Sequence, residues 1–329
     1  MVTVESVSPH VSLIRGPIGS GFVAIYVIVG RRVTLVDTGY AFHPQGAIEP
    51  ALASLGLSLR DIDLVLTTHG HADHAGGLGP VVAASGAGVG LHREDLARLS
   101  GGSARTADSD EFLTAFRRLG LDRRATEREA MLLESTGGTV EIRHILTGGE
   151  RLDLGSGVAV DVVATPGHTT GSISFIVDPD RIALVGDAIQ GLGGAAGLPL
   201  YNDPEAYRAS LERLGELDVT AAGMGHAFRS DYRGDRWPVV SREALGPLLA
   251  ESAAAPGVAD EVAAAVWAGR PVSTAEAVRD VVRRMPPPYG PLDLELETSG
   301  GASLHAALLH LARAARAEAG LAGRQAPAT

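Results

Sequence analysis

The sequence contains no cysteine and no lysine, so all 28 of its basic residues are arginine. The absence of cysteine excludes disulfides, thiolate nucleophiles and Cys-ligated zinc. The absence of lysine excludes Schiff-base chemistry and a Walker-type phosphate loop, because both need a lysine amine. Catalysis through sulfur or through a lysine side chain is therefore ruled out.

Long apolar runs are also missing. The longest run, near residues 22–29, is far shorter than the roughly 20 residues that span a bilayer. Glu5 stands where a signal peptide would carry positive charge. These features predict a soluble, cytoplasmic protein.

Positive charge is scarce relative to negative charge, and the formal net charge is −11. A chain this acidic repels phosphate backbones, and no run of four or more basic residues marks a local basic groove. We therefore expect no nucleic-acid partner. With 329 residues, of which 45% are hydrophobic, the chain is long enough for one large or two ordinary domains and can form a sizeable core.

Segments rich in β-branched residues alternate with helical segments over residues 1–236, which is typical of an α/β protein. The charged stretch 93–138 interrupts this pattern, and the spacing of Phe112, Phe116 and Leu119 predicts a helical insertion. The predicted strands are 11–15, 22–29, 33–37, 63–67, 140–145, 158–164, 172–177, 182–185 and 219–224, and the predicted helices outside the insertion are 44–55 and 204–214.

Beyond about residue 237 the sequence becomes Ala-rich and helical in spacing. This change predicts one domain over 1–236 and a C-terminal helical extension over 237–329, whose helices are candidates for pairing two subunits in a homodimer. Within the extension we predict helices over 239–253, 257–268, 274–285 and 302–319, a stiff proline-rich loop over 285–291 and a frayed tail over 320–329.

Histidine and aspartate gather at four places, each directly after a predicted strand, and the densest is His69-Gly-His71-Ala-Asp73-His74. Neutral imidazole suits zinc, iron and nickel, and a carboxylate can bridge two cations. His69 and His71 can turn to one metal while Asp73 and His74 face a second, and Asp73 is also a candidate N-cap for a following helix. The remaining candidate ligands are His168 in T-P-G-H-T-T-G, Asp187 in V-G-D and His226 in G-M-G-H.

The alternative is that these histidines are ordinary core or surface residues, as most single histidines are. A hydrophobic core needs no such density of imidazole, and a solvated face more often uses Glu, Asp and Arg. The combination over 69–74 therefore favours a metal site. The other six histidines lack such neighbours and are assigned structural or surface roles: His10, His43, His92, His144, His305 and His310.

The four motifs, taken in order over residues 8–230, resemble the metallo-β-lactamase superfamily signature H-x-H-x-D-H, T-P-G-H-T-x-G-S, G-D and G-x-G-H. The resemblance implies a four-layer αββα sandwich with two metals at one edge. It assigns His69, His71 and His168 to one metal and Asp73, His74 and His226 to the other, with Asp187 bridging them.

Residues 35–39, Leu-Val-Asp-Thr-Gly, also resemble an early L-x-D-T-G element of the same superfamily. The resemblance implies that Asp37 orients a ligand loop or a ligand histidine. A plain β-turn aspartate is the equal alternative.

Two divalent metal ions, expected to be zinc with iron or manganese also compatible, can lower the pKa of a shared water toward about 7 and polarise a scissile carbonyl. Asp73 would orient the attacking water or shuttle its proton, so the reaction needs no serine or cysteine nucleophile. The rival signatures G-x-S-x-G and H-E-x-x-H are absent.

Asp187 stands where two-zinc β-lactamases commonly carry cysteine, and this resembles glyoxalase II, the lactonases and other ester or thioester hydrolases. The predicted function is therefore hydrolysis of an ester, thioester or lactone in a small-molecule acyl substrate. The basic glutathione-binding residues expected near the C-terminus of glyoxalase II are not recognisable, which argues against hydroxyacylglutathione as the substrate.

Substrate choice is expected to depend on residues 93–138 and the C-terminal helices. The insertion's apolar side chains could roof an acyl pocket, although we favour the interpretation that they form the insertion's own core. They are Phe112, Phe116, Met131 and Leu132. Arg229 and Tyr232 are candidates for contacting a substrate carboxylate or carbonyl, with a plain surface loop as the alternative.

Three other functions compete. Residues 273–276 and 304–311 faintly resemble a winged-helix-like extension of superfamily nucleases, but the charge argues against nucleic acid. Persulfide dioxygenases of the superfamily bind one iron through fewer ligands, whereas seven candidate ligands favour two metals. A non-catalytic scaffold is the third. Residues 191–196, Gly-Leu-Gly-Gly-Ala-Ala, satisfy a loose dinucleotide pattern, but Pro199 prevents a long helix there, so we predict a flexible loop.

Overall fold

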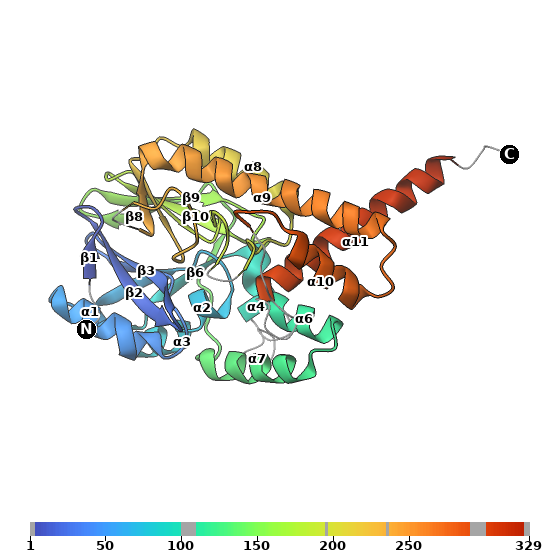
Figure 1. Ribbon diagram of the computed structural model, residues 1–329. Coiled ribbons are helices and arrows are strands. Elements are labelled where there is room, and N and C mark those ends of the chain that lie inside the picture. The colour runs from blue at the N-terminus through green and yellow to red at the C-terminus, as the bar shows by residue number, and fades with distance from the viewer. Residues whose placement is uncertain (1–3, 100–109, 195–196, 235–236, 290–300, 326–329) are drawn as a thin grey trace.

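Two β-sheets packed face to face form the centre of the molecule, and helices cover the outer face of each (Figure 1). The computed structural model describes residues 4–99, 110–194, 197–234, 237–289 and 301–325. The arrangement confirms the predicted four-layer αββα sandwich with a helical insertion and a C-terminal helical extension.

The first sheet has seven strands in the order β1-β2-β3-β4-β5-β6-β7. Its first half is the predicted antiparallel meander, and its second half, from β4 onward, is parallel. The strands are β1 (Val4–Ser6), β2 (Val11–Ile18), β3 (Gly21–Val29), β4 (Val33–Val36), β5 (Ile62–Leu66), β6 (Gly88–His92) and β7 (His144–Leu146).

The second sheet has six strands in the order β13-β12-β11-β10-β9-β8 and is antiparallel except for the β11–β12 pair. Its strands are β8 (Arg151–Gly155), β9 (Val158–Ala164), β10 (Ile173–Asp178), β11 (Ile182–Gly186), β12 (Ala221–Met224) and β13 (Val239–Ser241).

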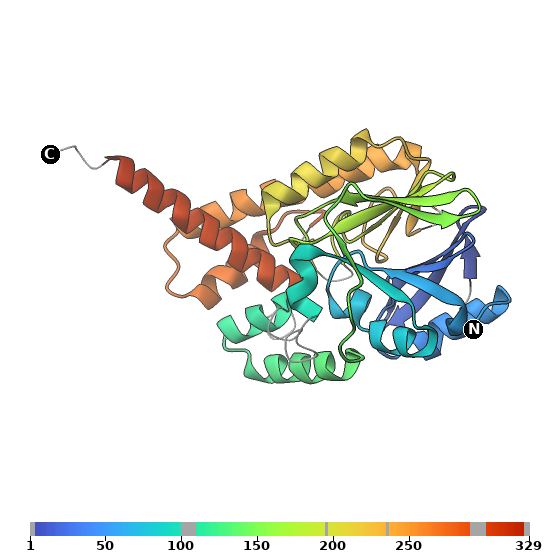
Figure 2. The same ribbon diagram turned by 180° about the vertical axis from the view of Figure 1, so that it is seen from behind.

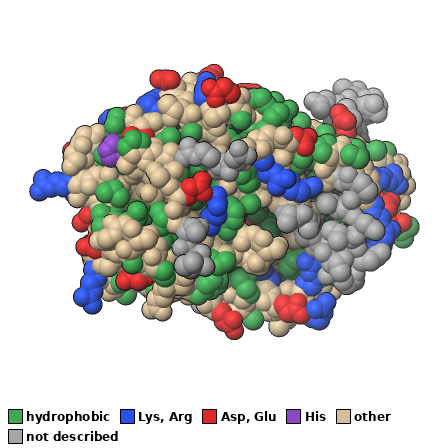
Figure 3. All heavy atoms as spheres, turned by 60° about the vertical axis from the view of Figure 1, so that its left-hand side comes forward, with side chains coloured by type: hydrophobic (Ala, Val, Ile, Leu, Met, Phe, Trp, Pro, Cys, Tyr) green, Lys and Arg blue, Asp and Glu red, His purple; other side chains and the backbone are tan. Residues whose placement is uncertain are grey.

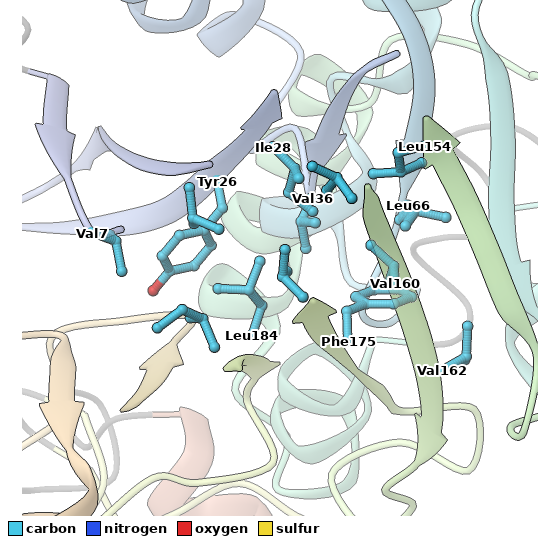
Figure 4. Close-up of a cluster of buried hydrophobic side chains, with 14 of the residues drawn as sticks. Val7, Tyr26, Ile28, Val36, Leu66, Leu154, Val160, Val162, Phe175 and Leu184 are labelled. Carbon is cyan, nitrogen blue, oxygen red and sulfur yellow. The ribbon is translucent and has the colours of Figure 1, made fainter. Parts of the chain in front are cut away.

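Apolar side chains from both sheets interlock in the space between them (Figure 4). Along β3, Tyr26 and Ile28 point into this space, whereas Ile25 and Val27 point to the outer helices, as the two-residue period of a strand requires. Because both faces of β3 are buried, its sequence is apolar throughout. The Tyr26 hydroxyl donates a 2.9 Å hydrogen bond to the Met224 carbonyl, which ties β3 to β12.

The helices α1 and α3 cover the first sheet, and α8 and α9 cover the second (Figures 1 and 2). The helix α8 begins where the sequence predicts, because Asp203 accepts from the backbone N–H groups of Glu205 and Ala206. The helical elements are η1 (Pro44–Ile48), α1 (Glu49–Ser54), η2 (Leu59–Asp61), α2 (Ala72–Ala75), α3 (Leu78–Ser85), η3 (Arg93–Asp95), α4 (Leu96–Leu99), α6 (Glu111–Arg118), α7 (Asp122–Ser135), α8 (Pro204–Glu216), α9 (Arg242–Ala268), α10 (Thr274–Arg284) and α11 (Gly301–Gln325).

The insertion and the extension share one apolar cluster. Side chains of α6 and α7 pack with those of α9, α10 and α11, including Phe116, Leu132, Val281 and Leu308. The favoured interpretation of the insertion's apolar face as its own core is thus correct for Phe116 and Leu132, with the addition that the C-terminal helices complete that core. Residues 100–109, which belong to the predicted insertion, lie outside the described residues.

Several predicted boundaries are wrong. The predicted break between residues 253 and 257 is absent, because α9 continues through Pro256 and packs on the second sheet before it and on α11 after it. Its predicted first residues, 239–241, are instead strand β13. The helix α11 extends to Gln325, beyond the predicted end at 319, whereas residues 326–329 are not described. Of the predicted proline-rich loop, 285–289 follow α10 without helix, and 290–291 are not described.

The predicted strand over 140–145 is also wrong at its start, since pairing begins only at His144. Val140 and Ile142 pack against the outer apolar cluster without joining the sheet. Within the described residues, no helix combines the length and hydropathy that crossing a bilayer requires.

Candidate metal centre

All seven predicted ligand side chains come together in space. Those of residues 69–74 follow β5 and lie on the loop and short helix α2, whereas the others follow β9, β11 and β12 of the second sheet. Three groups of these side chains each place their ligand atoms within 4.8 Å of one another: His69, His71 and His168; His69, His74 and Asp187; and Asp73, His74 and His226.

The first group is a triangle of imidazole nitrogens. His71 Nδ1 lies 3.0 Å from His69 Nε2 and 2.9 Å from His168 Nε2, and the two Nε2 atoms are 3.1 Å apart. These separations are close to those between neighbouring ligands of a cation bound at about 2.0–2.1 Å, the usual Zn–N distance.

The outer nitrogen of each ring in the triangle faces an acceptor. His71 Nε2 lies 2.8 Å from Glu111 Oε2, and His168 Nδ1 lies 2.6 Å from the Leu200 carbonyl. His69 Nδ1 lies 3.0 Å from Thr68 Oγ1, whose own proton goes to Asp37, so Thr68 accepts here. With the ring protons on these outer nitrogens, three lone pairs converge on one point, an arrangement that a cation between them would stabilise.

The second group repeats this arrangement. His226 Nε2 lies 3.1 Å from His74 Nε2 and 3.2 Å from Asp73 Oδ2. The outer nitrogens again face acceptors, because His74 Nδ1 is 2.8 Å from Asp37 Oδ2 and His226 Nδ1 is 3.0 Å from the Phe22 carbonyl.

Asp187 lies between the two groups. One carboxylate oxygen is 3.5 Å from His74 Nε2, and the other is 3.6 Å from His168 Nε2 and 3.7 Å from His226 Nε2. The first of these oxygens is buried and has no hydrogen-bond partner. A buried carboxylate oxygen is costly to leave unpaired, and divalent cations would pair with it. The imidazole and carboxylate donors therefore fit two metal ions of the zinc, iron or manganese type.

Glycine is required beside this carboxylate. A Cβ on Gly225 would lie 2.3 Å from Asp187 Oδ1 and 2.8 Å from His74 Cε1. The Gly before His226 thus lets β12 approach the centre closely.

Burial and charge divide the ligands into two kinds. Burial and the neighbouring histidines lower the pKa of His69 well below its usual value, and burial followed by His71 lowers the pKa of His168 to about 4. Burial acts the same way on His74, but Asp187, Asp37 and Asp73 outweigh it and raise the pKa of His74 to about 10. His69 and His168 are therefore neutral at neutral pH and can bind a metal directly, whereas His74 must first lose a proton.

Asp37 supports two candidate ligands through hydrogen bonds on the side of the rings that faces away from the centre. Its carboxylate accepts from the Thr68 N–H and hydroxyl at 2.8 Å each and from His74. It therefore contacts both the ligand loop and a ligand histidine, which are the two contacts that the resemblance implies. Its backbone is left-handed, with φ of 63°, a conformation in which aspartate is tolerated better than most residues.

The expectation that Asp73 caps a helix is wrong. The N-cap of α2 is His71, with no side-chain cap, and the Asp73 carboxylate faces His226 instead. Burial opposes ionisation of Asp73, but His74 and His226 hold its pKa well below the usual range. Asp73 is therefore ionised at neutral pH.

Two supporting carboxylates are not found by sequence reasoning. Asp95 accepts from the backbone N–H groups of Gly70 at 2.7 Å and Gly171 at 3.0 Å, so it joins the two ligand loops of the triangle. Glu111 holds His71 from the insertion. Neither belongs to a motif, and each meets its partners only through the fold, so no signal in the sequence singles them out.

A cavity of about 300 Å³ opens onto the candidate ligands His71, Asp73, His168, Asp187 and His226. Its apolar wall consists of side chains from several elements: Ile18, Phe22, Phe112, Leu198, Leu200, Phe228 and Ala302. Phe112 comes from the insertion and Ala302 from α11, so both regions expected to set substrate choice reach the cavity.

Arg229 donates to four backbone carbonyls, those of Leu192 at 2.7 Å, Gly194 at 2.8 Å, Gly197 at 3.0 Å and Pro288 at 3.4 Å. It thus ties down the loop after Asp187. Tyr232 is 43% exposed. Neither side chain lines the described part of the cavity, and substrate contact by either stays a prediction.

Several of the other histidines have local partners. His10 pairs with Asp180, and His43 accepts from the Tyr40 N–H. His310 lies between the Tyr201 hydroxyl and Asp260. These contacts fit the structural roles that the sequence assigns to them.

Residues 18–226 match the metallo-beta-lactamase superfamily, and the chain belongs to this superfamily. It is similar to a hydroxyacylglutathione hydrolase of Acidiphilium cryptum, at 30% identity over 60% of this chain and 68% of that one. It is also similar to the mouse metallo-beta-lactamase domain-containing protein 1, at 32% identity over 60% of this chain and 62% of that one. The chain thus matches about two thirds of the length of these relatives.

Solved structures show the same fold over more of the chain. A metallo-beta-lactamase family protein from Thermus thermophilus covers 96% of this chain and 95% of its own, with a TM-score of 0.68 and 25% identity. A subclass B3 metallo-beta-lactamase of Bradyrhizobium japonicum covers 76% of this chain and 90% of its own, with a TM-score of 0.55 and 21% identity. The match to the Thermus thermophilus protein includes the C-terminal helices, because it covers nearly the whole length of both chains.

Proposed function

We propose that this chain is a binuclear metal-dependent hydrolase that cleaves an ester, thioester or lactone bond in a small-molecule acyl substrate. The observation that carries the proposal is the convergence of five imidazole nitrogens around Asp187, which has a buried oxygen without a hydrogen-bond partner. We assign His69, His71 and His168 to one metal and Asp73, His74 and His226 to the other, with Asp187 between them.

Two bound divalent cations would activate water near neutral pH and polarise a carbonyl. The chain's own groups hold and orient the reactants. Because Asp73 is ionised and faces the cavity, it accepts a hydrogen bond from the attacking water and fixes the direction of attack. The apolar wall, including Phe22 and Phe112, holds the acyl part of the substrate and excludes bulk water.

The lining of the cavity supports an acyl substrate. Arg128 is the only basic side chain other than histidine among the residues described as lining the cavity, and it already pairs with Asp110 at 2.6 Å. On the face shown in Figure 3, Arg side chains are scattered among acidic ones without forming a stripe, unlike a nucleic-acid surface. The similarity to a hydroxyacylglutathione hydrolase is consistent with thioester cleavage.

Metal analysis combined with a substrate panel tests the proposal. We expect close to two divalent metals per chain, and turnover of a thioester, an aryl ester or a lactone in preference to a phosphodiester or a penicillin. Asp187→Ala is expected to lower the rate by at least 100-fold and to reduce the bound metal while leaving the circular dichroism spectrum unchanged. Carefully purified protein without metal, or a fully active Asp187→Ala enzyme, would refute the proposal.

The same panel distinguishes the competing functions. Preferential cleavage of a phosphodiester would indicate a nuclease or phosphodiesterase, and one iron per chain with oxygen consumption on a persulfide would indicate a dioxygenase. A domain boundary near residue 237, a homodimer formed through the C-terminal helices and a cytoplasmic location stay predictions.

A further inference from the structure

We propose that Glu111, carried by the inserted helix α6, positions His71 for metal binding and thereby couples metal occupancy to the docking of that helix. The proposal rests on the metal centre proposed above. It concerns a positioning residue, because Glu111 acts on the metal through His71.

Both oxygens of the Glu111 carboxylate have hydrogen-bond partners. One oxygen lies 2.8 Å from His71 Nε2. The other accepts from Arg98 Nη2 at 2.6 Å and from Asn202 Nδ2 at 2.7 Å. Since the side chain of Glu111 is only 8% exposed, these contacts fix its position without competition from solvent.

The contact decides which nitrogen of His71 faces the metal. A carboxylate that takes the proton of Nε2 leaves the lone pair on Nδ1, which points into the triangle with His69 and His168. The matching partners of those two rings are Thr68, next to His69 in the chain, and the backbone carbonyl of Leu200. His71 differs because its partner is a side chain from a separate helix.

The helix α6 also forms part of the cavity wall. Phe112, the residue after Glu111, lines the cavity and lies so close to α11 that a Cβ on Gly301 would be 2.4 Å from its ring. Asp110, the residue before, caps α6 and pairs with Arg128 of α7. The first turn of α6 thus contacts a candidate metal ligand, the cavity wall and the neighbouring helices. Because coupling between two equilibria is reciprocal, metal binding would stabilise the docked position of α6, and docking of α6 would raise the affinity for metal.

Competition with a chromogenic chelator measures the first consequence. Zinc or cobalt(II) affinity is expected to fall about 10–100-fold in Glu111→Gln, the usual effect of removing a carboxylate from a ligand histidine. Glu111→Asp, which keeps the charge but retracts it from His71, should show a comparable loss. Glu129→Gln on α7 is the matched control, because Glu129 pairs with Arg117 away from the centre and both side chains are exposed.

Hydrogen exchange measures the second consequence. In the wild-type protein and in Glu129→Gln, adding zinc should slow amide exchange in residues 111–118, and in both Glu111 variants it should not. A merely structural role for Glu111 would lower the melting temperature of the metal-free protein but leave metal affinity unchanged.

The outcomes separate this inference from the proposed function. If wild-type protein binds no metal, the proposed function fails and the inference with it. If wild-type protein binds metal and both Glu111 variants bind it equally tightly, with the same protection of α6, only the inference is overturned.

Discussion

At the scale of single residues, the geometry of the centre depends on which group accepts the hydrogen bond from each imidazole N–H. Five imidazoles donate outward to Thr68, Glu111, Asp37 and two backbone carbonyls, so the other nitrogen of each ring points to the centre and can bind a metal, in His74 after the loss of its second proton. Asp37 accepts three hydrogen bonds, from the Thr68 N–H, the Thr68 hydroxyl and His74.

Asp37→Asn tests this role. Asparagine tolerates the left-handed backbone, but its amide would direct a donor at either Thr68 or His74, which are themselves donors to this group. We expect a loss of about 1–3 kcal/mol in the free energy of unfolding, the typical cost of a mismatched buried polar group. Urea denaturation of metal-free protein measures it.

The same variant should bind close to one metal per chain, because His74 loses its orientation. Asp218→Asn is the control, since the side chain of Asp218 is exposed. An Asp37→Asn protein with the stability and metal content of the wild type would contradict this role.

At the scale of elements, the sequence predicts the segments whose local pattern agrees with their packing. The meander over 11–37 and the helix from Pro204 have such patterns. The strand β6 does not, because Gly88 and Gly90 weaken its pattern. A Cβ on Gly90 would lie 2.9 Å from Leu66, so the glycine that hides the strand in the sequence is what lets it pair with β5.

Pro256 illustrates the opposite case. Proline favours a helix end, but buried contacts on both sides of Pro256 keep α9 continuous. For the centre, the dense run over 69–74 lets the sequence single out candidate ligands that the fold then brings together. Asp95 and Glu111 are not predictable, because their partners are distant in the chain and meet them only after folding.

The packing of α11 on α9 should depend on pH through His310. Its ring is buried, accepts from the Tyr201 hydroxyl and donates to Asp260, with Arg313 and Arg208 nearby. Burial lowers the pKa of His310, whereas the unfolded chain takes up the proton near pH 6.5. Stability is therefore fully present above pH 6.5 and decreases as pH falls from there toward the lowered folded value.

His310→Gln removes this titration. Between pH 7.5 and 5 the wild-type protein should lose more unfolding free energy than the variant, as measured by urea denaturation at each pH. Parallel stability curves for the two proteins would show that His310 does not contribute.

The Phe112 side chain of the inserted helix α6 should affect substrate binding more than chemistry. Phe112→Ala removes apolar surface from the cavity wall, which is worth about 1–2 kcal/mol for a side chain of this size that is only partly buried. We expect KM for a long-chain acyl thioester to rise about 10-fold with kcat nearly unchanged, and an acetyl thioester to be affected little. Leu133→Ala, at a 47% exposed position of α7, is the control.

At the scale of the whole molecule, the candidate ligands come from both sheets. Residues 69–74 follow a strand of the first sheet, whereas His168, Asp187 and His226 follow strands of the second. Metals bound between them would therefore link the two halves of the sandwich, in addition to the apolar core that joins the sheets.

Removal of metal should accordingly destabilise the fold as a whole. At a free metal concentration about 100 times the dissociation constant, binding adds about 2.7 kcal/mol per site. We expect chelation to lower the melting temperature by several degrees, and added zinc to restore it. An unchanged melting temperature after verified metal removal would contradict this link between the sheets.

The positions of the candidate ligands along the chain also determine the order in which they leave the ribosome during synthesis. Strand β3 pairs at Val23 with His226, and the Phe22 carbonyl accepts a hydrogen bond from the His226 ring. These contacts of the N-terminal hairpin can form only after His226 has been synthesised. The three-histidine group has all its members once His168 has emerged, whereas the group with Asp73 and His74 cannot be complete until His226 follows. Under the proposed assignment, a translation product truncated before β12 lacks His226 and therefore cannot complete the group with Asp73 and His74, whereas the three-histidine group keeps all its members.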